Sequence, residues 1–439
     1  MSLKKAYSLT EIPNAFRPDP LKEEQLAEFY EDTIEARTGV RGKSGIEDIY
    51  EACHDPQEHN AHLLMGHWGC GKSTELNRLA MRLRQEGFCV KTIFCKQELD
   101  VLNIDFSDVM LLLAEALLKM ADASSYSPEP TDLRVLREYQ AEIVKETKMD
   151  LSAENALEAG VELQTPKLLK SLISGFARIK SSLKYNESSS TTVRQKITSR
   201  ISEWINAVNR IADGLTNASC DHQPIIIFED LDKGDTGRVF SGHGEQLTAM
   251  HFPLIYTFPI ARSYLPEFSA LEAFFQIHRL PMIEIRLMNG ERNPDGFQAI
   301  RSIVERRAEL SLFAKLSAGK NQDVLDLMIE KTGGSLRNLF FSINDAATLS
   351  RRRGESQITQ EAAEDALEDI KSSLSSRIDG KDYPFLVEIY RGKHRGFDDR
   401  TQLQRLMQAG AVLEYNGKRW HDVHPLIVDF LREIEVIKL

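Results

Sequence analysis

Gly66-His-Trp-Gly-Cys-Gly-Lys-Ser73 decides the fold, because this stretch satisfies the pattern G-x-x-x-x-G-K-[ST] without deviation. An apolar run from Ala61 to Met65 precedes it, and a helical pattern from Lys72 to Gln85 follows it. Glycines in such a turn let backbone N–H groups surround phosphate oxygens at a helix N-terminus, whose partial positive charge favours an anion. The stretch therefore predicts a phosphate-binding loop between a strand and a helix.

Each residue of this loop has an expected role in holding a nucleotide. Lys72 is expected to reach the β- and γ-phosphates, and Ser73 to ligate Mg²⁺. The residues expected to bind the nucleotide are Gly66, His67, Trp68, Gly69, Cys70, Gly71, Lys72, Ser73 and Thr74.

An acidic strand end supplies what phosphoryl transfer needs besides the loop. Pro224-Ile-Ile-Ile-Phe-Glu229-Asp230-Leu-Asp232 is an apolar run that ends in carboxylates, which belong at the C-terminal end of a strand beside the phosphate loop. We assign Glu229 to the metal, often through water, and Asp230 to the attacking water. The alternative, with Asp230 on the metal and Asp232 assisting, stays open. The expected metal ligands are therefore Ser73, Glu229 and Asp230.

Three further residues are candidates for contacts with the nucleotide. Thr257 closes a predicted strand from Phe252 to Phe258, where a polar side chain could sense the γ-phosphate. Arg337 follows a Gly-Gly pair at the start of a helix, from which an arginine can fold back onto phosphates. Arg262, shortly after the Thr257 strand, is a candidate for charge contacts within the chain or across a subunit boundary.

Short apolar runs alternate with longer amphipathic segments after residue 60, which is typical of a parallel sheet with helices on both faces. Besides the runs already named, strands are expected at Phe88 to Phe94 and at Met282 to Leu287. The expected units are lead-in helices over 1–60, a core over 61–295 with a mostly helical insertion at about 122–222, an all-helical unit over 296–378 and a last unit over 379–439. A Ser/Thr run from Ser188 to Thr192 is read as a surface loop within the insertion.

The last unit is expected to contain three helices, a hairpin from Val412 to Trp420 with Asn416-Gly417 at its turn, and a final helix. Ten Lys/Arg and ten Asp/Glu between residues 379 and 439 leave no net basic charge, which argues against contact with DNA phosphates. We expect Tyr415 and Trp420 to pack the hairpin against the small helical unit or a partner rather than to stack on nucleotides. DNA binding is therefore possible but not favoured, and contact with a partner protein is preferred.

Composition bounds the remaining possibilities. A net charge of −11, with 42% hydrophobic and 28% charged residues, is ordinary for a globular protein and unlike a surface built to hold a polyanion. The first residues contain no apolar leader, and no run is long enough to span a membrane. Five scattered cysteines suit a reducing compartment, so the cytoplasm is the expected location and no membrane partner is expected.

Together these motifs resemble the AAA+ and STAND branch of P-loop ATPases, above all the origin-recognition-complex-like group, and KAP-type ATPases are similar at the acidic strand. The resemblance covers nearly the whole chain. It is carried by GHWGCGKSTEL (66–76), IIIFEDLDK (225–233), TGGSLRNL (332–339) and LEYNGKRWHDVHPLI (413–427). The loop and the long insertion also resemble uncharacterised bacterial ATPases that share GHxGxGKSTEL.

The resemblance implies an α/β fold of the P-loop NTPase class, with a helix-flanked parallel sheet in the order 5-1-4-3-2, an α-helical lid and a C-terminal winged-helix domain. It also implies ATP and Mg²⁺ as ligands, and a nucleotide-driven change that acts on a homo-oligomer or an effector partner. The likeness to the uncharacterised bacterial ATPases implies a role in mobile elements or phage defence. Glu229 departs from the more common aspartate, and no unambiguous arginine finger is found. A DNA-loading ATPase and a slow-turnover signalling switch are the alternatives to an ATPase with a continuous hydrolysis cycle.

Overall fold

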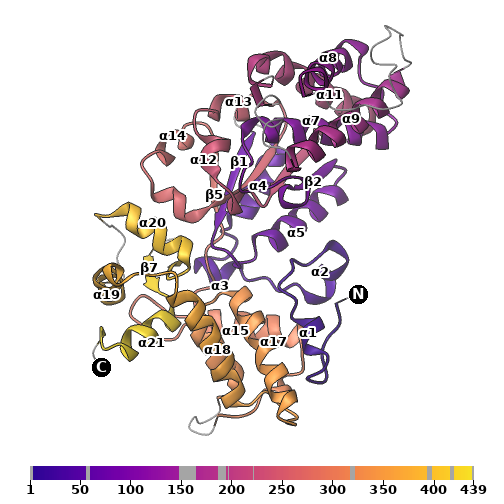
Figure 1. The fold of residues 1–439 in the computed structure, drawn as a ribbon. Helices are drawn as coiled ribbons and strands as arrows, with labels where there is room; N and C mark the ends of the chain where they lie inside the picture. Colours follow the sequence, from indigo (N-terminus) through magenta and orange to yellow (C-terminus); the bar gives the residue numbers. More distant parts are fainter. Residues whose placement is uncertain are drawn as a thin grey trace.

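A five-stranded parallel sheet lies at the centre of the computed structural model, which describes residues 3–55, 60–147, 165–185, 194–195, 197–220, 222–316, 322–392, 398–415 and 420–437 (Figure 1). The strand order is β2-β3-β4-β1-β5, and every pairing is parallel. The strands are β1 (Ala61–Gly66), β2 (Val90–Phe94), β3 (Ile225–Glu229), β4 (Leu254–Pro259) and β5 (Gln276–Arg279). This is the predicted order 5-1-4-3-2 of a P-loop NTPase, so the expected fold class is confirmed.

Both faces of the sheet are covered, which explains why its central strands are apolar throughout. In β3, Ile225 and Ile227 pack with α4 (Gly45–His54) and α5 (Lys72–Gln85) on one face. Ile226 and Phe228 pack on the opposite face with α7 (Phe106–Ala123). Alternate side chains therefore enter two different cores.

The fifth strand lies at Gln276–Arg279, so the prediction of a strand from Met282 to Leu287 was wrong. The edge strand β5 has the pattern Gln-Ile-His-Arg and is only partly buried, because it pairs on one side alone. Ile283 and Ile285 are buried, but they pack with the helical unit that follows the sheet. The run from Met282 to Leu287 therefore passes from the core of the sheet to the core of the helical unit.

The segment between β2 and β3 forms a helical bundle at the end of the molecule opposite the helical unit α15–α18 (Figure 1). After the short α6 (Cys95–Glu98), helices α7 and α8 (Pro130–Thr147) each pack with α9 (Thr165–Tyr185) and α11 (Ile201–Ser219). Buried Tyr139, Phe176 and Trp204 meet edge to face in the bundle core. The predicted helical character is confirmed, and the Ser188 to Thr192 run lies outside the described residues.

The four helices after the sheet begin where a polar side chain caps the helix. They are α15 (Pro294–Arg307), α16 (Val324–Lys331), α17 (Leu336–Arg352) and α18 (Gln360–Ser375). Asn293, Asp323, Ser335 and Thr359 each accept a backbone N–H of the first turn, which satisfies a donor that the helix itself leaves free. The helices α1 (Ile12–Ala15), α2 (Glu23–Phe29) and α3 (Ile34–Thr38) pack between this helical unit and α5.

The C-terminal unit has the arrangement of a winged helix. Helices α19 (Tyr383–Gly392) and α20 (Arg400–Ala409) precede the antiparallel pair β6 (Val412–Tyr415) and β7 (Trp420–Val423), and α21 (Pro425–Glu433) follows. Among the described residues two α-helices precede the hairpin rather than the three predicted. The predicted turn at Asn416-Gly417 lies outside the described residues.

The hairpin packs on the sheet core. Tyr415 and Trp420 stack on each other and join the cluster that contains Leu64 and Ile255. The indole N–H of Trp420 donates to Glu284 Oε1 at 2.9 Å. These aromatic side chains were expected to pack the hairpin against the small helical unit or a partner, but they lie in the core of the parallel sheet.

A disulfide joins Cys89 and Cys220, whose Cα atoms are 5.8 Å apart. This bond differs from the expectation of a reducing compartment, which rested on the scattered positions of the five cysteines and on Cys70 in the loop. Cys53, Cys70 and Cys95 are free and buried. Cys89 directly precedes β2 and Cys220 lies between α11 and β3, so the bond joins the segments that enter two neighbouring parallel strands. None of the described helices is long and apolar enough to cross a membrane.

The remaining short elements connect these units. They are α12 (Thr236–Phe240), α13 (Gly244–Thr248), α14 (Phe268–Glu272) and the 3-10 turns η2 (Leu231–Lys233), η3 (Ile260–Tyr264), η4 (Leu310–Leu312) and η5 (Gly380–Asp382).

Candidate functional site

The phosphate-binding loop joins β1 to α5 as the sequence predicts. Gly69 and Gly71 have φ angles of 80° and 105°, which only glycine adopts without strain. A Cβ on Gly66 would lie 2.7 Å from the Leu280 carbonyl oxygen, so a close backbone approach also requires glycine there. Helix α5 then begins at Lys72, with its N-terminus facing the space enclosed by the loop.

Lys72 is the central cation of the site and is buried, with 7% of its side chain exposed. Its Nζ lies 2.9 Å from Asp232 Oδ2 and donates to the carbonyl oxygens of Gly66 and His67 at 2.8 and 3.0 Å. Burial opposes the charge, yet the neighbouring Asp232 carboxylate more than offsets it and raises the pKa of Lys72. The ion pair therefore links the loop after β1 to the acidic turn after β3.

Ser73 and Glu229 form the second contact between these two strand ends. Ser73 Oγ donates to Glu229 Oε2 at 3.0 Å. Glu229 is 2% exposed, and its other carboxylate oxygen, Oε1, has no hydrogen-bond partner. Burial, reinforced by the nearby acids Asp232 and Asp230, raises the pKa of Glu229 to about 7. A buried carboxylate with a free oxygen beside a serine hydroxyl is chemically suited to a hard cation.

The donor set fits Mg²⁺ held jointly by protein and nucleotide. Within the residues described, no group of three or more His, Cys, Asp or Glu side chains could hold a metal ion. Mg²⁺ is usually bound by one or two carboxylates together with phosphate oxygens and water. Ser73 and Glu229 meet that requirement, and the carboxylate of Asp230, which pairs with Lys233, lines the same cavity.

Thr257 lies next to this acidic turn, and its hydroxyl is engaged with the backbone. Thr257 Oγ1 accepts the N–H of Leu231 at 3.1 Å and donates to the Phe228 carbonyl at 3.3 Å. The side chain is fully buried and fixes the acidic turn against β4. A role in sensing the γ-phosphate stays a prediction.

A cavity runs from the loop to the helical unit and the N-terminal segment. Its walls comprise the loop and acidic turn (Trp68, Gly69, Gly71 to Glu75, Asp230, Asp232, Lys233), the N-terminal segment (Pro18 to Leu21, Phe29 to Glu31, Thr33, Arg37) and the helical unit (Ile303, Arg307, Leu336, Arg337, Phe340). A Cβ on Gly69 would lie 2.5 Å from that of Arg337, so the start of α17 rests directly on the loop. Arg337 is exposed and makes no ion pair within the described residues.

Arg262 is not among the residues that line this cavity. Its guanidinium donates to Asp235 Oδ1 at 2.9 Å and to Thr236 Oγ1 at 3.0 Å. The structure thus gives Arg262 a contact within the chain, and a contact across a subunit boundary stays a prediction.

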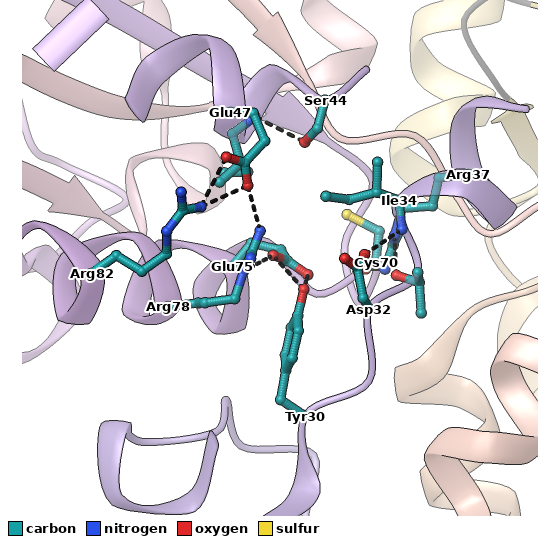
Figure 2. Close-up of polar contacts among 12 residues, drawn as sticks. Tyr30, Asp32, Ile34, Arg37, Ser44, Glu47, Cys70, Glu75, Arg78 and Arg82 are labelled. Carbon is teal, nitrogen blue, oxygen red and sulfur yellow. Dashed lines mark hydrogen bonds and ion pairs between the residues drawn. The ribbon is translucent and has the colours of Figure 1, made fainter. Parts of the chain in front are cut away.

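The N-terminal wall was missed by the sequence analysis. Figure 2 shows Arg37 beside the loop, where it donates to the Cys70 carbonyl oxygen at 2.7 Å, and Tyr30 pointing at Glu75 of α5. The Tyr30 hydroxyl lies 3.2 Å from both Glu75 carboxylate oxygens, and Arg78 donates to Glu75 at 3.1 Å. The available signal was Glu75 itself, an acid in the first turn after the loop with Arg78 three residues later.

The C-terminal hairpin contacts the back of the loop. The N–H of Glu414 in β6 donates to His67 Nε2 at 2.8 Å. Burial, together with the charge of Lys72 and with His421, lowers the pKa of His67 to about 3, so the ring is neutral and can accept this bond. The Tyr415 hydroxyl donates to the Gly333 carbonyl at 2.8 Å, which ties the same hairpin to the segment before α17.

Comparison with known proteins adds little to this geometry. No protein-family model matches the chain, and no curated protein matches it significantly. Solved structures with some likeness include the Aeropyrum pernix ORC2 protein in ADPNP–ADP complexes (11% identity, 96% of each chain covered, TM-score 0.43) and a Walker-type ATPase of Pyrococcus abyssi (12%, 95% of this chain and 99% of that one, 0.44). Cdc6p of Pyrobaculum aerophilum is similar over 96% of this chain and 97% of that one, at 11% identity and a TM-score of 0.35. These values carry no argument about function.

The raised pKa of Glu229 predicts that metal binding depends on pH. Mg²⁺ competes with the proton for this carboxylate, so Mg²⁺ affinity in the presence of ATP should rise as pH increases through about 7. For a single group with that pKa, the ionised fraction increases about tenfold between pH 6 and 8. Titration of Mg²⁺ into protein and ATP at several pH values measures the slope, after correction for the protonation of ATP itself.

Glu229→Gln is the matched control, because glutamine keeps the shape and removes the titration. This variant should bind Mg²⁺ more weakly, and its Mg²⁺ affinity should no longer change with pH once the protonation of ATP is corrected for. An unchanged pH profile in this variant would show that Glu229 is not the metal-linked carboxylate.

Proposed function

We propose that this chain binds ATP with Mg²⁺ and hydrolyses the nucleotide, and that the resulting change is passed to the helical lid and the C-terminal unit. One observation carries the proposal: Lys72, Ser73, Glu229 and Asp232 come from two strand ends and meet beside one cavity. Phosphoryl transfer needs this combination of a mobile cation, a hydroxyl and carboxylates at the mouth of a phosphate loop.

Lys72 must exchange partners for the site to work. Its Nζ is now held by the Asp232 carboxylate, and the γ-phosphate would offer it a second anion of higher charge. The loop N–H groups and the N-terminus of α5 would hold the other phosphate oxygens. The exchange would leave Asp232 without its cation, which gives ATP binding a direct effect on the acidic turn.

The acids would then divide the remaining tasks. Ser73 and Glu229 would hold Mg²⁺, which when bound neutralises charge on the phosphates. The Asp230 carboxylate, which lines the cavity beside Lys233, would orient the attacking water. The contact of Ser73 with Glu229 favours this assignment over the one that places Asp230 on the metal.

The lid would complete the site from the other side. Arg337 is exposed, lines the cavity and rests on Gly69, so its guanidinium is available to the γ-phosphate. The ribose and base would extend toward the N-terminal wall, where Leu21 and Tyr30 offer apolar surface opposite Phe340 of α17.

A slow-turnover signalling switch is the second candidate function. The bond from Glu414 to His67 connects the C-terminal hairpin directly to the phosphate loop, so a nucleotide that moves the loop also affects the hairpin. Such coupling suits a protein that binds an effector, or further copies of itself, only when a particular nucleotide is bound. Rapid steady-state ATP turnover by the protein alone would exclude this candidate, whereas tightly co-purified ADP with negligible turnover would favour it.

DNA reading by the C-terminal unit has less support. In α20, the helix that would enter a groove, the side chains of Gln402 and Arg405 are both bound to buried Asp382. Leu403, Leu406 and Met407 are buried on the other side. Gln402 and Arg405 are therefore held by the fold and are not presented to a groove.

Substitution Lys72→Ala tests the phosphate-site assignment. Loss of the one flexible cation of the loop should weaken ATP binding by at least ~100-fold, measured by titration calorimetry. Lys91→Ala removes an exposed lysine of β2 and should leave ATP affinity unchanged. Thermal unfolding checks that both variants fold, and undiminished ATP binding by a folded Lys72→Ala variant would refute the assignment.

Substitution Asp230→Asn should preserve ATP binding and remove hydrolysis, because it takes away the proposed water-orienting carboxylate and spares the Ser73–Glu229 pair. Phosphate release under saturating ATP measures the loss. If Asp230→Asn instead abolishes Mg²⁺-dependent binding while Glu229→Gln removes only turnover, the two roles are reversed.

A further inference from the structure

Helix α9 of the bundle between β2 and β3 carries basic side chains and no acidic ones, although the whole chain has a net charge of −11. Lys167, Lys170, Arg178 and Lys184 are exposed. At about 100° per residue the four positions lie within about 120° of the helix circumference, which places them on one side of the helix. The four side chains therefore form a basic stripe along α9.

No residue in the described part of the bundle neutralises this stripe. None of its four cations makes an ion pair with a described residue, whereas the bundle's other exposed charges are largely paired. Glu138 pairs with Arg134 and Arg200, and Glu142 also pairs with Arg200. Glu138 and Glu142 are thus held by Arg134 of α8 and by Arg200, the residue before α11, and no described acid neutralises the stripe.

The exposed residues between the basic side chains are small. They are Ser174, Ala177 and Ser181. The apolar residues of the helix, including Leu172 and Phe176, are buried in the bundle. The stripe therefore offers nothing to insert into a bilayer and no apolar patch for a protein interface, so recognition must rest on charge.

We propose that the α9 stripe binds the phosphate backbone of a nucleic acid, without reading its sequence. From Lys167 to Lys184 the helix axis rises about 25 Å, the length of about seven base pairs of duplex. Small residues between the cations let a backbone approach closely. This surface is separate from the C-terminal unit, and the proposal does not depend on ATP binding or hydrolysis.

The fifth cation of α9 connects the stripe to the nucleotide core. Lys180 is 9% exposed and pairs with Glu98 at the end of α6 and with Glu115 of α7, the latter at 2.5 Å. Helix α6 follows β2 directly and contacts β3, the strand that ends in Glu229. A ligand that displaces α9 would therefore also displace α6, which contacts β3.

Fluorescence anisotropy with a labelled 30-base-pair duplex of arbitrary sequence tests the proposal on the full chain without nucleotide. If all four cations contact phosphates, log K should fall with log salt concentration at a slope of about −3.6. The variant Lys167→Gln, Lys170→Gln, Arg178→Gln and Lys184→Gln should bind at least ~30-fold more weakly at low salt and lose most of that slope. A second duplex of different sequence should bind equally well.

A control variant removes the same charge elsewhere, with Arg41, Lys43, Lys315 and Lys381, all exposed, changed to glutamine. It should bind the duplex like the unmodified protein. Circular dichroism verifies that the α9 variant retains its helices, and the single change Arg178→Gln, which should reduce the slope by about one, provides a milder test.

Absence of duplex binding at 50 mM salt by the unmodified protein, or equal losses in the α9 and control variants, would overturn the proposal. Vesicles containing phosphatidylserine are tested in parallel. Binding to vesicles but not to duplex, lost in the α9 variant, would also overturn it, because the stripe would then serve an anionic membrane surface.

Discussion

The buried ion pair between Lys72 and Asp232 is the contact on which the site depends. Both side chains are almost fully removed from solvent, and a charge in such a place is tolerated only when it is paired and hydrogen-bonded. Two carbonyl oxygens of the loop complete the coordination of the ammonium group. The loop after β1 and the turn after β3 are therefore held in one geometry, and under the proposed function a phosphate bound to Lys72 would change it.

Other parts of the chain contact the same loop from different directions. Arg37 binds the Cys70 carbonyl, His67 accepts a bond from the C-terminal hairpin, and Gly69 supports the start of α17. These contacts come from the N-terminal segment, the C-terminal unit and the lid. A movement of this loop would therefore shift its contacts with all three parts, so a nucleotide bound at the loop could change the positions of residues far from it.

Local pattern was sufficient to predict most of the fold, and it placed the candidate residues of the loop and the acidic turn at neighbouring strand ends. Helix α5 begins and ends where the periodicity places it, and the sheet order follows the resemblance. The edge strand β5 was missed because a half-buried strand with polar residues lacks the continuous apolar pattern of its neighbours. The sequence could not predict the Cys89–Cys220 bond or the contact from His67 to Glu414, because both join residues more than a hundred positions apart.

A structure determined with Mg²⁺ and the ADP–beryllium fluoride complex, which mimics the γ-phosphate, tests the central claim most directly. The account predicts that Lys72 Nζ leaves Asp232 for the fluoride, that Mg²⁺ lies between Ser73 and Glu229, directly or through water, and that Arg337 approaches the same group. An intact Lys72–Asp232 pair, with the nucleotide bound elsewhere or absent, would contradict it.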